Sequence, residues 1–202
     1  MKKITFLVLV GSLLAISPAF AATPAQKLVP LEYEKKVAKK QQKTTSNSSR
    51  KGAKAKSAVA PAVYDCRVEV AAISDSRNNK VTLGSTWAEP LLPQGLDTWL
   101  EAVRTQELVN HTSKWNGSRQ LQIKPSLNRL YSYAESMNIH GVVSLNVEYW
   151  LDNKLVDTKY YRGVGSKANM MNALGEYATA LNYAVHEVAP EVIEDAKQLC
   201  KK

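Results

Sequence analysis

Histidine, cysteine and phenylalanine are scarce in this chain of 202 residues, which holds 3 His, 2 Cys and 2 Phe. Neither a His-Glu-x-x-His nor a Cys-x-x-Cys spacing occurs, so the sequence lacks the usual ligand patterns of a zinc site. The Gly-x-Ser-x-Gly motif of a hydrolase nucleophile is missing as well. These absences predict a protein that is not an enzyme and that uses neither a cofactor nor a metal.

Long apolar stretches are missing too. The run Ile4–Ile16 is only 13 residues long, whereas a helix needs about 20 to span a bilayer. It follows Lys2 and Lys3 and precedes a small-x-small triplet at 19–21, which is the arrangement of an export signal. We expect cleavage before Ala22, a periplasmic location that includes peripheral attachment to a membrane, and no transmembrane span in the mature chain.

Cys66 and Cys200 are the only cysteines, and they lie near the two ends of the predicted folded region. An even number of cysteines in an exported protein favours a disulfide. Closing so long a loop would stabilise the fold by about 4–5 kcal/mol if the effect is purely one of chain entropy. Two buried free thiols are the alternative, but we predict a Cys66–Cys200 disulfide.

Positive charge is concentrated in one segment. The formal net charge is +9, and residues 22–60 alone contain ten Lys or Arg against two Asp or Glu. The segment is poor in apolar residues, so we predict a disordered tether. We expect it to bind anionic lipid or a cell-wall polymer and not nucleic acid, with a solvated spacer as the alternative. The tether cations are Lys35, Lys36, Lys39, Lys40, Lys43, Arg50, Lys51, Lys54 and Lys56.

Residues 61–202 are predicted to form a single domain. Apolar residues occupy every second position from Val143 to Leu151, which is the pattern of a strand with one buried face. Asp152-Asn153 then predicts a hairpin turn into a strand over 154–164. Apolar residues recur at helical spacing over 94–109 and over 169–199, where Pro190 should kink or split the second helix.

The remaining extended segments complete the predicted sheet. Residues 63–73 are rich in Val, and Val81–Leu83 is a short strand candidate. Leu121–Tyr133 is a third candidate, which Pro125 should make a bulged or edge strand. We predict an α+β fold, a two-layer sandwich with a mainly antiparallel sheet of about four to five strands and two helices on one face.

Several short segments resemble known lipoproteins. The sequence Trp-Ala-Glu-Pro-Leu at 87–91, with the apolar helix positions of 96–103, resembles part of the ABC-type transport auxiliary lipoproteins, the PqiC-like family. The run 150–156 and the long last helix resemble that family as well. Asp-Ser-Arg at 75–77 and the run 155–163 are similar to the YajG-like lipoproteins.

The resemblance implies a small α+β domain that works at the cell envelope without catalysis. In the PqiC-like case it also implies a partner in a lipid-transport assembly. Both families are lipidated at an N-terminal Cys, whereas this chain has Ala22 at that place. The basic tether could replace the lipid, because a polybasic segment is itself a membrane-attachment signal.

Trp150 is the first of the predicted partner-binding residues. It points away from the buried face of its strand, and Tyr131, Tyr133, Tyr160 or Tyr161 would extend an apolar patch around it, depending on register. Packing beneath a loop is the alternative for Trp150.

Two further groups are candidates for partner contact. Trp87 and Pro90 would form an anchor, or else plug the open end of the sandwich. Asp75 and Arg77 would form a polar patch, although a capped turn with a surface ion pair is favoured. The complete set of partner-binding candidates is Trp150, Trp87, Pro90, Tyr160, Asp75 and Arg77.

The predicted function is a non-enzymatic exported envelope protein that binds a partner protein or an amphiphile. An accessory role in lipid transport is implied by the resemblance alone. The alternatives are a soluble carrier that encloses a lipid between helix and sheet, and a small cell-envelope hydrolase with an unrecognised site. An internal apolar pocket would favour the carrier, whereas an exposed aromatic sheet face would favour partner binding.

Overall fold

The computed structural model describes residues 26–34, 64–86 and 89–201. The predicted export signal, Trp87 and all the named tether cations lie outside the described residues. The strands are β1 (Lys27–Pro30), β2 (Cys66–Val70), β3 (Ser74–Asp75), β4 (Gly84–Ser85), β5 (Pro90–Gln94), β6 (Arg119–Glu135), β7 (Asn138–Leu151) and β8 (Lys154–Ala168). The helical segments are α2 (Leu96–Val103), η2 (Arg104–Val109), α3 (Asn110–Thr112) and α4 (Leu174–Leu199).

All these strands belong to one eight-stranded sheet. Its order is β1-β5-β4-β6-β7-β8, and β2 and β3 also pair with β6. The α+β class is confirmed, but the prediction of four to five strands was too low. The long strands β6, β7 and β8 are antiparallel, whereas β2, β3 and β4 run parallel to β6. β3 and β4 have two residues each, which is too short for an alternating pattern to appear in the sequence.

β6 runs through Pro125 without interruption and lies inside the sheet, so the predicted edge position is wrong. The carbonyl oxygens of Ile123 and Leu127 accept hydrogen bonds from the chain that forms β2 and β3. The nitrogen of Pro125, midway between them, points to the same side. Pro125 falls between the stretches paired with β2 and β3, so its missing N–H costs no ladder bond. The predicted bulge occurs nearby, between Leu127 and Arg129.

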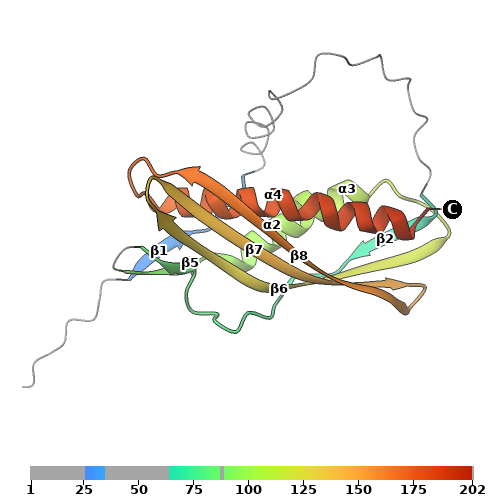
Figure 1. Ribbon diagram of the computed structural model, residues 1–202. Coiled ribbons are helices and arrows are strands. Elements are labelled where there is room, and N and C mark those ends of the chain that lie inside the picture. The colour runs from blue at the N-terminus through green and yellow to red at the C-terminus, as the bar shows by residue number, and fades with distance from the viewer. Residues whose placement is uncertain (1–25, 35–63, 87–88, 202) are drawn as a thin grey trace, which may run out of the picture.

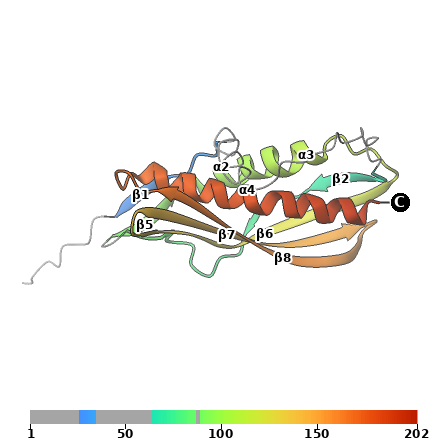
Figure 2. The same ribbon diagram turned by 45° about the horizontal axis from the view of Figure 1, so that its top comes forward.

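The helices lie on one face of the sheet, as Figures 1 and 2 show. The first helical segment continues from α2 through the π-helical η2 to Thr112 in α3, slightly beyond the predicted end. α4 is one helix that contains Pro190, so the predicted split does not occur. Pro190 is exposed, and the carbonyl group that it leaves without an intrahelical donor can therefore bind water.

Glycines let α4 approach the sheet closely. Gly141 of β7 and Gly165 of β8 are cross-strand partners, and a β-carbon on either would overlap the backbone of Ala180 in α4. Gly163 faces the backbone of Ala184 in the same way. The helix therefore lies directly on the backbone of two strands, which identifies the inner face of β7 and β8 independently of the apolar alternation.

Residues 26–34 are ordered against the domain, so the predicted disordered tether is wrong for this part of the chain. β1 pairs in parallel with β5, and Val29 and Leu31 are buried. The side-chain amide of Asn182 in α4 donates a 2.8 Å hydrogen bond to the Glu32 carbonyl oxygen. The apolar residues of this stretch offset its ordering entropy. The prediction missed them because it averaged composition over a much longer basic segment.

The predicted disulfide is confirmed. Cys66 at the start of β2 is bonded to Cys200 at the end of α4, with a Cα–Cα distance of 5.4 Å. Both cysteines are fully buried, and the Asp65 N–H donates to the Cys200 carbonyl oxygen beside them. The disulfide therefore ties the first strand of the main domain to the C-terminal end of its longest helix.

Candidate functional site: the open face of the sheet

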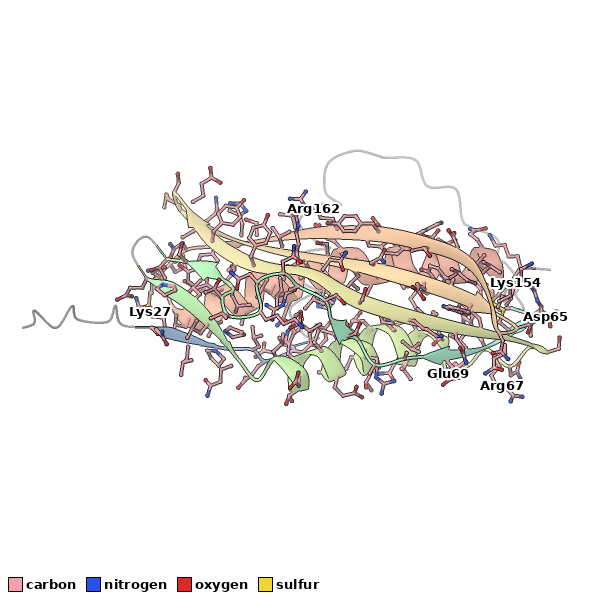
Figure 3. The ribbon with its side chains drawn as sticks, turned by 90° about the horizontal axis from the view of Figure 1, so that it is seen from below. Lys27, Asp65, Arg67, Glu69, Lys154 and Arg162 are labelled. Carbon is pink, nitrogen blue, oxygen red and sulfur yellow. A yellow bond between two sulfur atoms is a disulfide. The ribbon has the colours of Figure 1, made fainter. Side chains whose placement is uncertain are left out.

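No helix covers the side of β6, β7 and β8 that points away from α4, within the residues that the structure describes. Figure 3 looks onto this side, with α4 behind the strands. We name it the open face and define it from strand register and from the alternation that begins at the inward glycines. Its residues are Lys124, Ser126, Arg129, Tyr131 and Tyr133 of β6, His140, Val142, Ser144, Asn146, Glu148 and Trp150 of β7, and Thr158, Tyr160, Arg162, Val164 and Ser166 of β8.

Trp150 lies on the open face, as its strand pattern predicts, but it is only partly exposed. The Lys124 ammonium group lies 4.1 Å from the centroid of the Trp150 ring, and the indole N–H donates to the Glu148 carboxylate at 2.9 Å. Its cross-strand partners are Gln122 and Leu155. The expected cluster of tyrosines around Trp150 is therefore not formed, because Lys124, Gln122 and the exposed, apolar Leu155 occupy those positions.

The aromatic residues of the open face lie further along the strands. Tyr160 is 53% exposed and pairs with Asn146, four residues along β7 from Trp150. Tyr131 and Tyr133 stack at a centroid distance of 6.1 Å. Tyr161, in contrast, points to the inner face and is buried. The face thus carries separate aromatic groups, with charged and small residues between them.

A row of three residues crosses the middle of the open face. Ser144 of β7 pairs with Arg129 of β6 on one side and with Arg162 of β8 on the other. Both arginines are exposed, and no ion pair involves either within the described part of the chain. Ser144 is 0% exposed, and its hydroxyl group has no hydrogen-bond partner among the described residues.

A cavity of about 400 Å³ lies on the opposite layer, between η2–α3 and α4. Glu107 and His111 line one wall, and Glu194 and Lys197, which form an ion pair at 3.2 Å, line the other. Glu107 also approaches His186 at 3.8 Å beneath the N-terminal stretch. Among the described residues, no Ser, Thr or Cys lines this cavity.

Asp75 and Arg77 form an ion pair within a turn, which is the alternative that the sequence favoured for them. Two guanidinium nitrogens donate to the Asp75 carboxylate at 2.9 Å each, and the Arg77 backbone N–H donates at 3.2 Å. The hydrogen bonds from Arg77 lower the pKa of Asp75. Arg77 is buried, however, so the pair is not a surface pair as predicted. Pro90, another candidate, is half-buried at the start of β5.

Arg77 and the open face meet at a second cavity, of about 230 Å³. Arg77, Arg129 and Tyr131 line it together with Asn128, the residue at the bulge of β6. The Nη1 atom of Arg77 is buried and has no hydrogen-bond partner within the described part of the chain. The cavity therefore places cationic and amide groups beside the row of Arg129, Ser144 and Arg162.

The inner face contains a cluster of ionisable side chains beside α4. The hydroxyl groups of Tyr149 and Tyr161 lie 2.6 Å apart, and Tyr161 contacts the Asp195 carboxylate at 2.6 Å. Lys159 donates to the same carboxylate at 2.8 Å. Burial raises the pKa of both tyrosines, so they remain protonated donors at neutral pH and cannot act as bases. This arrangement fixes α4 on β8 and offers no activated nucleophile.

Three exposed methionines lie together at the end of the domain opposite the disulfide. Met137 of the β6–β7 turn is 78% exposed, and Met170 and Met171 of the β8–α4 loop are 76% and 86% exposed. The two segments are joined by a 2.7 Å hydrogen bond from the Asn169 N–H to the Met137 carbonyl oxygen. Figure 1 shows both segments at the end away from the C-terminus. Flexible, exposed methionines suit an adaptable apolar contact.

The interior of the domain is tightly packed. The apolar cavity beneath α2 and α4, lined by residues such as Trp99, Leu127 and Val188, has a volume of only about 10 Å³. In the described ranges no group of His, Cys, Asp and Glu is arranged to hold a metal ion. No helix there combines the length and apolar character that crossing a bilayer requires.

Sequence analysis missed Arg129, Ser144 and Arg162. The alternation of β7 assigns Ser144 to the side opposite Val143 and Leu145, and that was the only signal in the sequence. The alignment of both arginines with Ser144 depends on the bulge in β6 and on the β7–β8 register, which no local pattern determines.

Comparison with known proteins gives structural neighbours only. No protein-family model matches the sequence, and no curated protein matches it. Protein XCC0632 from Xanthomonas campestris, of the DUF330 family, aligns with a TM-score of 0.46 and 12% identity over 68% of this chain and 83% of its own. A candidate lipoprotein from Caulobacter crescentus CB15 gives 0.43 and 12%, over 66% and 90%. Lipoprotein GNA1162 from Neisseria meningitidis gives 0.26 and 10%, over 63% and 99%.

Proposed function

We propose that the protein is a non-enzymatic, exported protein of the periplasm that binds a partner protein or an amphiphile at the cell envelope. The observation that carries this proposal is the open face, which has three long strands, no helical cover in the described part and an exposed Tyr160. Arg129 and Arg162, which form no ion pair with any residue that the structure describes, lie on the same face. Arginine and tyrosine are the residue types enriched at binding hot spots.

An accessory role in lipid transport is the more specific form of the proposal. It is supported by the resemblance of 87–103 and 150–156 to the auxiliary lipoproteins, and by the apolar tip formed by the three methionines. In this form the basic residues of 35–56 attach the protein to anionic lipid or to a cell-wall polymer. Attachment and partner contact then use different parts of the chain.

The two alternatives receive less support. A carrier would need an internal apolar space, and the cavity beneath α4 is about the size of one water molecule. A hydrolase would need a nucleophile next to a base. The buried tyrosines around Asp195 are hydrogen-bond donors that connect α4 to the sheet. No Ser, Thr or Cys of the described ranges lies in the walls of the 400 Å³ cavity.

Photo-crosslinking in intact cells that carry the full chain tests the proposal. A photoreactive residue at position 160 lies on the open face, and one at the exposed position 113, just after α3, lies on the helical layer. We expect a specific adduct from position 160 and none from position 113. Equal adducts from both positions, or none from position 160, would contradict the open face as the working surface.

Tyr160→Ala then measures the strength of the contact. Loss of an aromatic hot spot should reduce recovery of the crosslinked partner by about tenfold or more. Thr158→Ala, two residues away on the same face, is the matched control. Both variants should unfold at the temperature of the unmodified protein, because both side chains are exposed.

A further inference from the structure

The row of Arg129, Ser144 and Arg162 has the features of an anion site, and its interpretation rests on the proposed function of the open face. Strand spacing puts the Cα atoms of the two arginines roughly 10 Å apart, with the small Ser144 between them. Their guanidinium groups can lean over Ser144 from both sides. Neither has an acidic partner within the described ranges, so both charges are available to a ligand.

The hydroxyl group of Ser144 is the second observation. A buried hydroxyl normally has a hydrogen-bond partner, because an unsatisfied polar group in the interior is costly. Ser144 Oγ has none in the described part of the chain, although the residue is fully buried under its neighbours on the open face. An oxyanion that drew the two guanidinium groups together would provide the missing acceptor.

The 230 Å³ cavity beside Arg129 adds further donors. Asn128 and Asn78 line this cavity, and each side-chain amide can donate two hydrogen bonds. Arg77 Nη1 is a second buried donor without a partner in the described residues, at the wall of the same cavity. The two buried polar groups of this region that have no partner among the described residues, Arg77 Nη1 and Ser144 Oγ, can both donate a hydrogen bond to an anion.

We infer that the middle of the open face binds the phosphate group of an anionic lipid headgroup. A carboxylate offers two oxygens in one plane and suits a single guanidinium group, whereas a phosphate presents oxygens to several donors at once. Tyr160 and Tyr131 lie two residues along the strands from Arg162 and Arg129 and border the site on both sides. Tyrosine is suited to the interface between headgroup and apolar chain.

Vesicle sedimentation with the full chain, at about 0.15 M salt, tests this inference. The vesicles are phosphatidylcholine alone, phosphatidylcholine with phosphatidic acid, and phosphatidylcholine with a fatty acid that gives the same surface charge. We expect tightest binding to the phosphatidic acid vesicles. Arg162→Gln and Arg129→Gln should each weaken that binding by about tenfold or more, since hydrogen bonds to charged groups are strong.

Arg67→Gln is the matched control. Arg67 is an exposed arginine of β2 that Figure 3 places at the far end of the sheet from Arg162. The Arg67→Gln substitution removes one positive charge, as Arg129→Gln and Arg162→Gln do. All three variants keep residues 35–56 intact, so any contribution of that basic segment to binding is common to them. We expect Arg67→Gln to bind like the unmodified protein. Ser144→Ala should weaken binding by about tenfold or more, because the Ser144 hydroxyl group would donate to a charged phosphate oxygen.

Four results would overturn the inference: equal loss in Arg67→Gln and Arg162→Gln, equal binding to the fatty-acid vesicles, binding of inorganic phosphate without binding of vesicles, or binding of an acidic peptide instead of lipid. Thermal unfolding of each variant checks that the fold is intact. If lipid binding fails while the crosslink from position 160 persists, the inference is wrong and the proposed function stands. If both fail, the open face is not the working surface.

Discussion

The two faces of the β6–β7–β8 sheet are built from the same strands, but their buried hydroxyl groups differ in whether they have hydrogen-bond partners. On the inner face, Tyr149 and Tyr161 are buried, and their hydroxyl groups contact each other, the Val192 carbonyl oxygen and the Asp195 carboxylate. On the open face, Ser144 is equally buried, yet its hydroxyl has no partner among the described residues. The buried tyrosine hydroxyl groups of the inner face are satisfied within the protein, whereas the buried hydroxyl group of Ser144 on the open face is left for a partner outside it.

Packing explains why the difference takes this form. α4 lies on the backbone of Gly141 and Gly165, so inward positions accept few substitutions. Outward positions have no helix against them in the described part. Residues suited to binding can therefore occupy these positions without disturbing the core. The comparison therefore predicts large effects on stability from inner-face changes and small ones from open-face changes.

Gly165→Val should break the inner face most severely. The new side chain would overlap the Ala180 carbonyl oxygen and the start of the Tyr183 side chain, so α4 would have to move off the sheet. We expect the free energy of unfolding to fall by about 3 kcal/mol or more, measured by urea denaturation followed by circular dichroism.

Thr158→Val, on the open face of the same strand, is the control for that change and should shift the free energy of unfolding by no more than about 0.5 kcal/mol. If Gly165→Val were as stable as Thr158→Val, α4 would not lie as close to β8 as the structure shows.

Asp195→Asn should have a smaller, pH-dependent effect on the inner face. Partial burial opposes ionisation, but hydrogen bonds from Lys159 and Tyr161 hold the pKa of Asp195 below its ordinary value. A carboxyl group with a lowered folded-state pKa stabilises fully above its unfolded value, and the stabilisation is lost as pH falls through the folded value. We expect Asp195→Asn to cost about 1–2 kcal/mol at pH 7 and progressively less as pH falls through the lowered pKa of Asp195.

Urea denaturation at several pH values measures this effect. Glu194→Gln is the matched control, because Glu194 precedes Asp195 on α4 and pairs with Lys197 on the exposed side at 3.2 Å. Its cost should stay within about 0.5 kcal/mol at pH 7. A cost of Asp195→Asn that did not change between pH 7 and pH 2 would show that its carboxylate charge does not hold α4 in place.

The same contrast explains what could be predicted from the sequence. The alternation from Val143 to Leu151 identified the buried side of β7, and the lone cysteine pair identified the disulfide. The alternation can be recognised within one strand, and the disulfide follows from the number of cysteines. β1 was missed because its apolar residues are few and lie beside a long basic segment. The two-residue strands β3 and β4 pair with β6 through contacts distant in sequence, which no local pattern reveals.

The candidate site was predicted only in part for a related reason. The sequence placed Trp150 on the outward side and left open whether Tyr160 or Tyr161 accompanies it. A local pattern gives no cross-strand register, and a shift of one residue changes every neighbour. The structure gives Trp150 the cation of Lys124 as its neighbour and puts Tyr160 opposite Asn146. The row of Arg129, Ser144 and Arg162 exists only in that register.

Apart from the control variants, Ser144→Ala gives the smallest expected change in stability, and it is the sharpest test of the comparison. Removing a buried hydroxyl that has no partner in the described part of the chain also removes its desolvation cost, while alanine keeps the small volume between the arginines. We expect the free energy of unfolding to rise by about 0.5–1 kcal/mol at pH 7.

Tyr161→Phe is the inner-face counterpart: it removes a hydroxyl 2.6 Å from the Asp195 carboxylate and should lower the free energy of unfolding by about 1 kcal/mol or more. Opposite signs for these two hydroxyl deletions would support an open face that gives up stability for binding. A loss of stability in Ser144→Ala would mean that the hydroxyl is satisfied in the free protein, and the contrast between the two faces would then be wrong at its central residue.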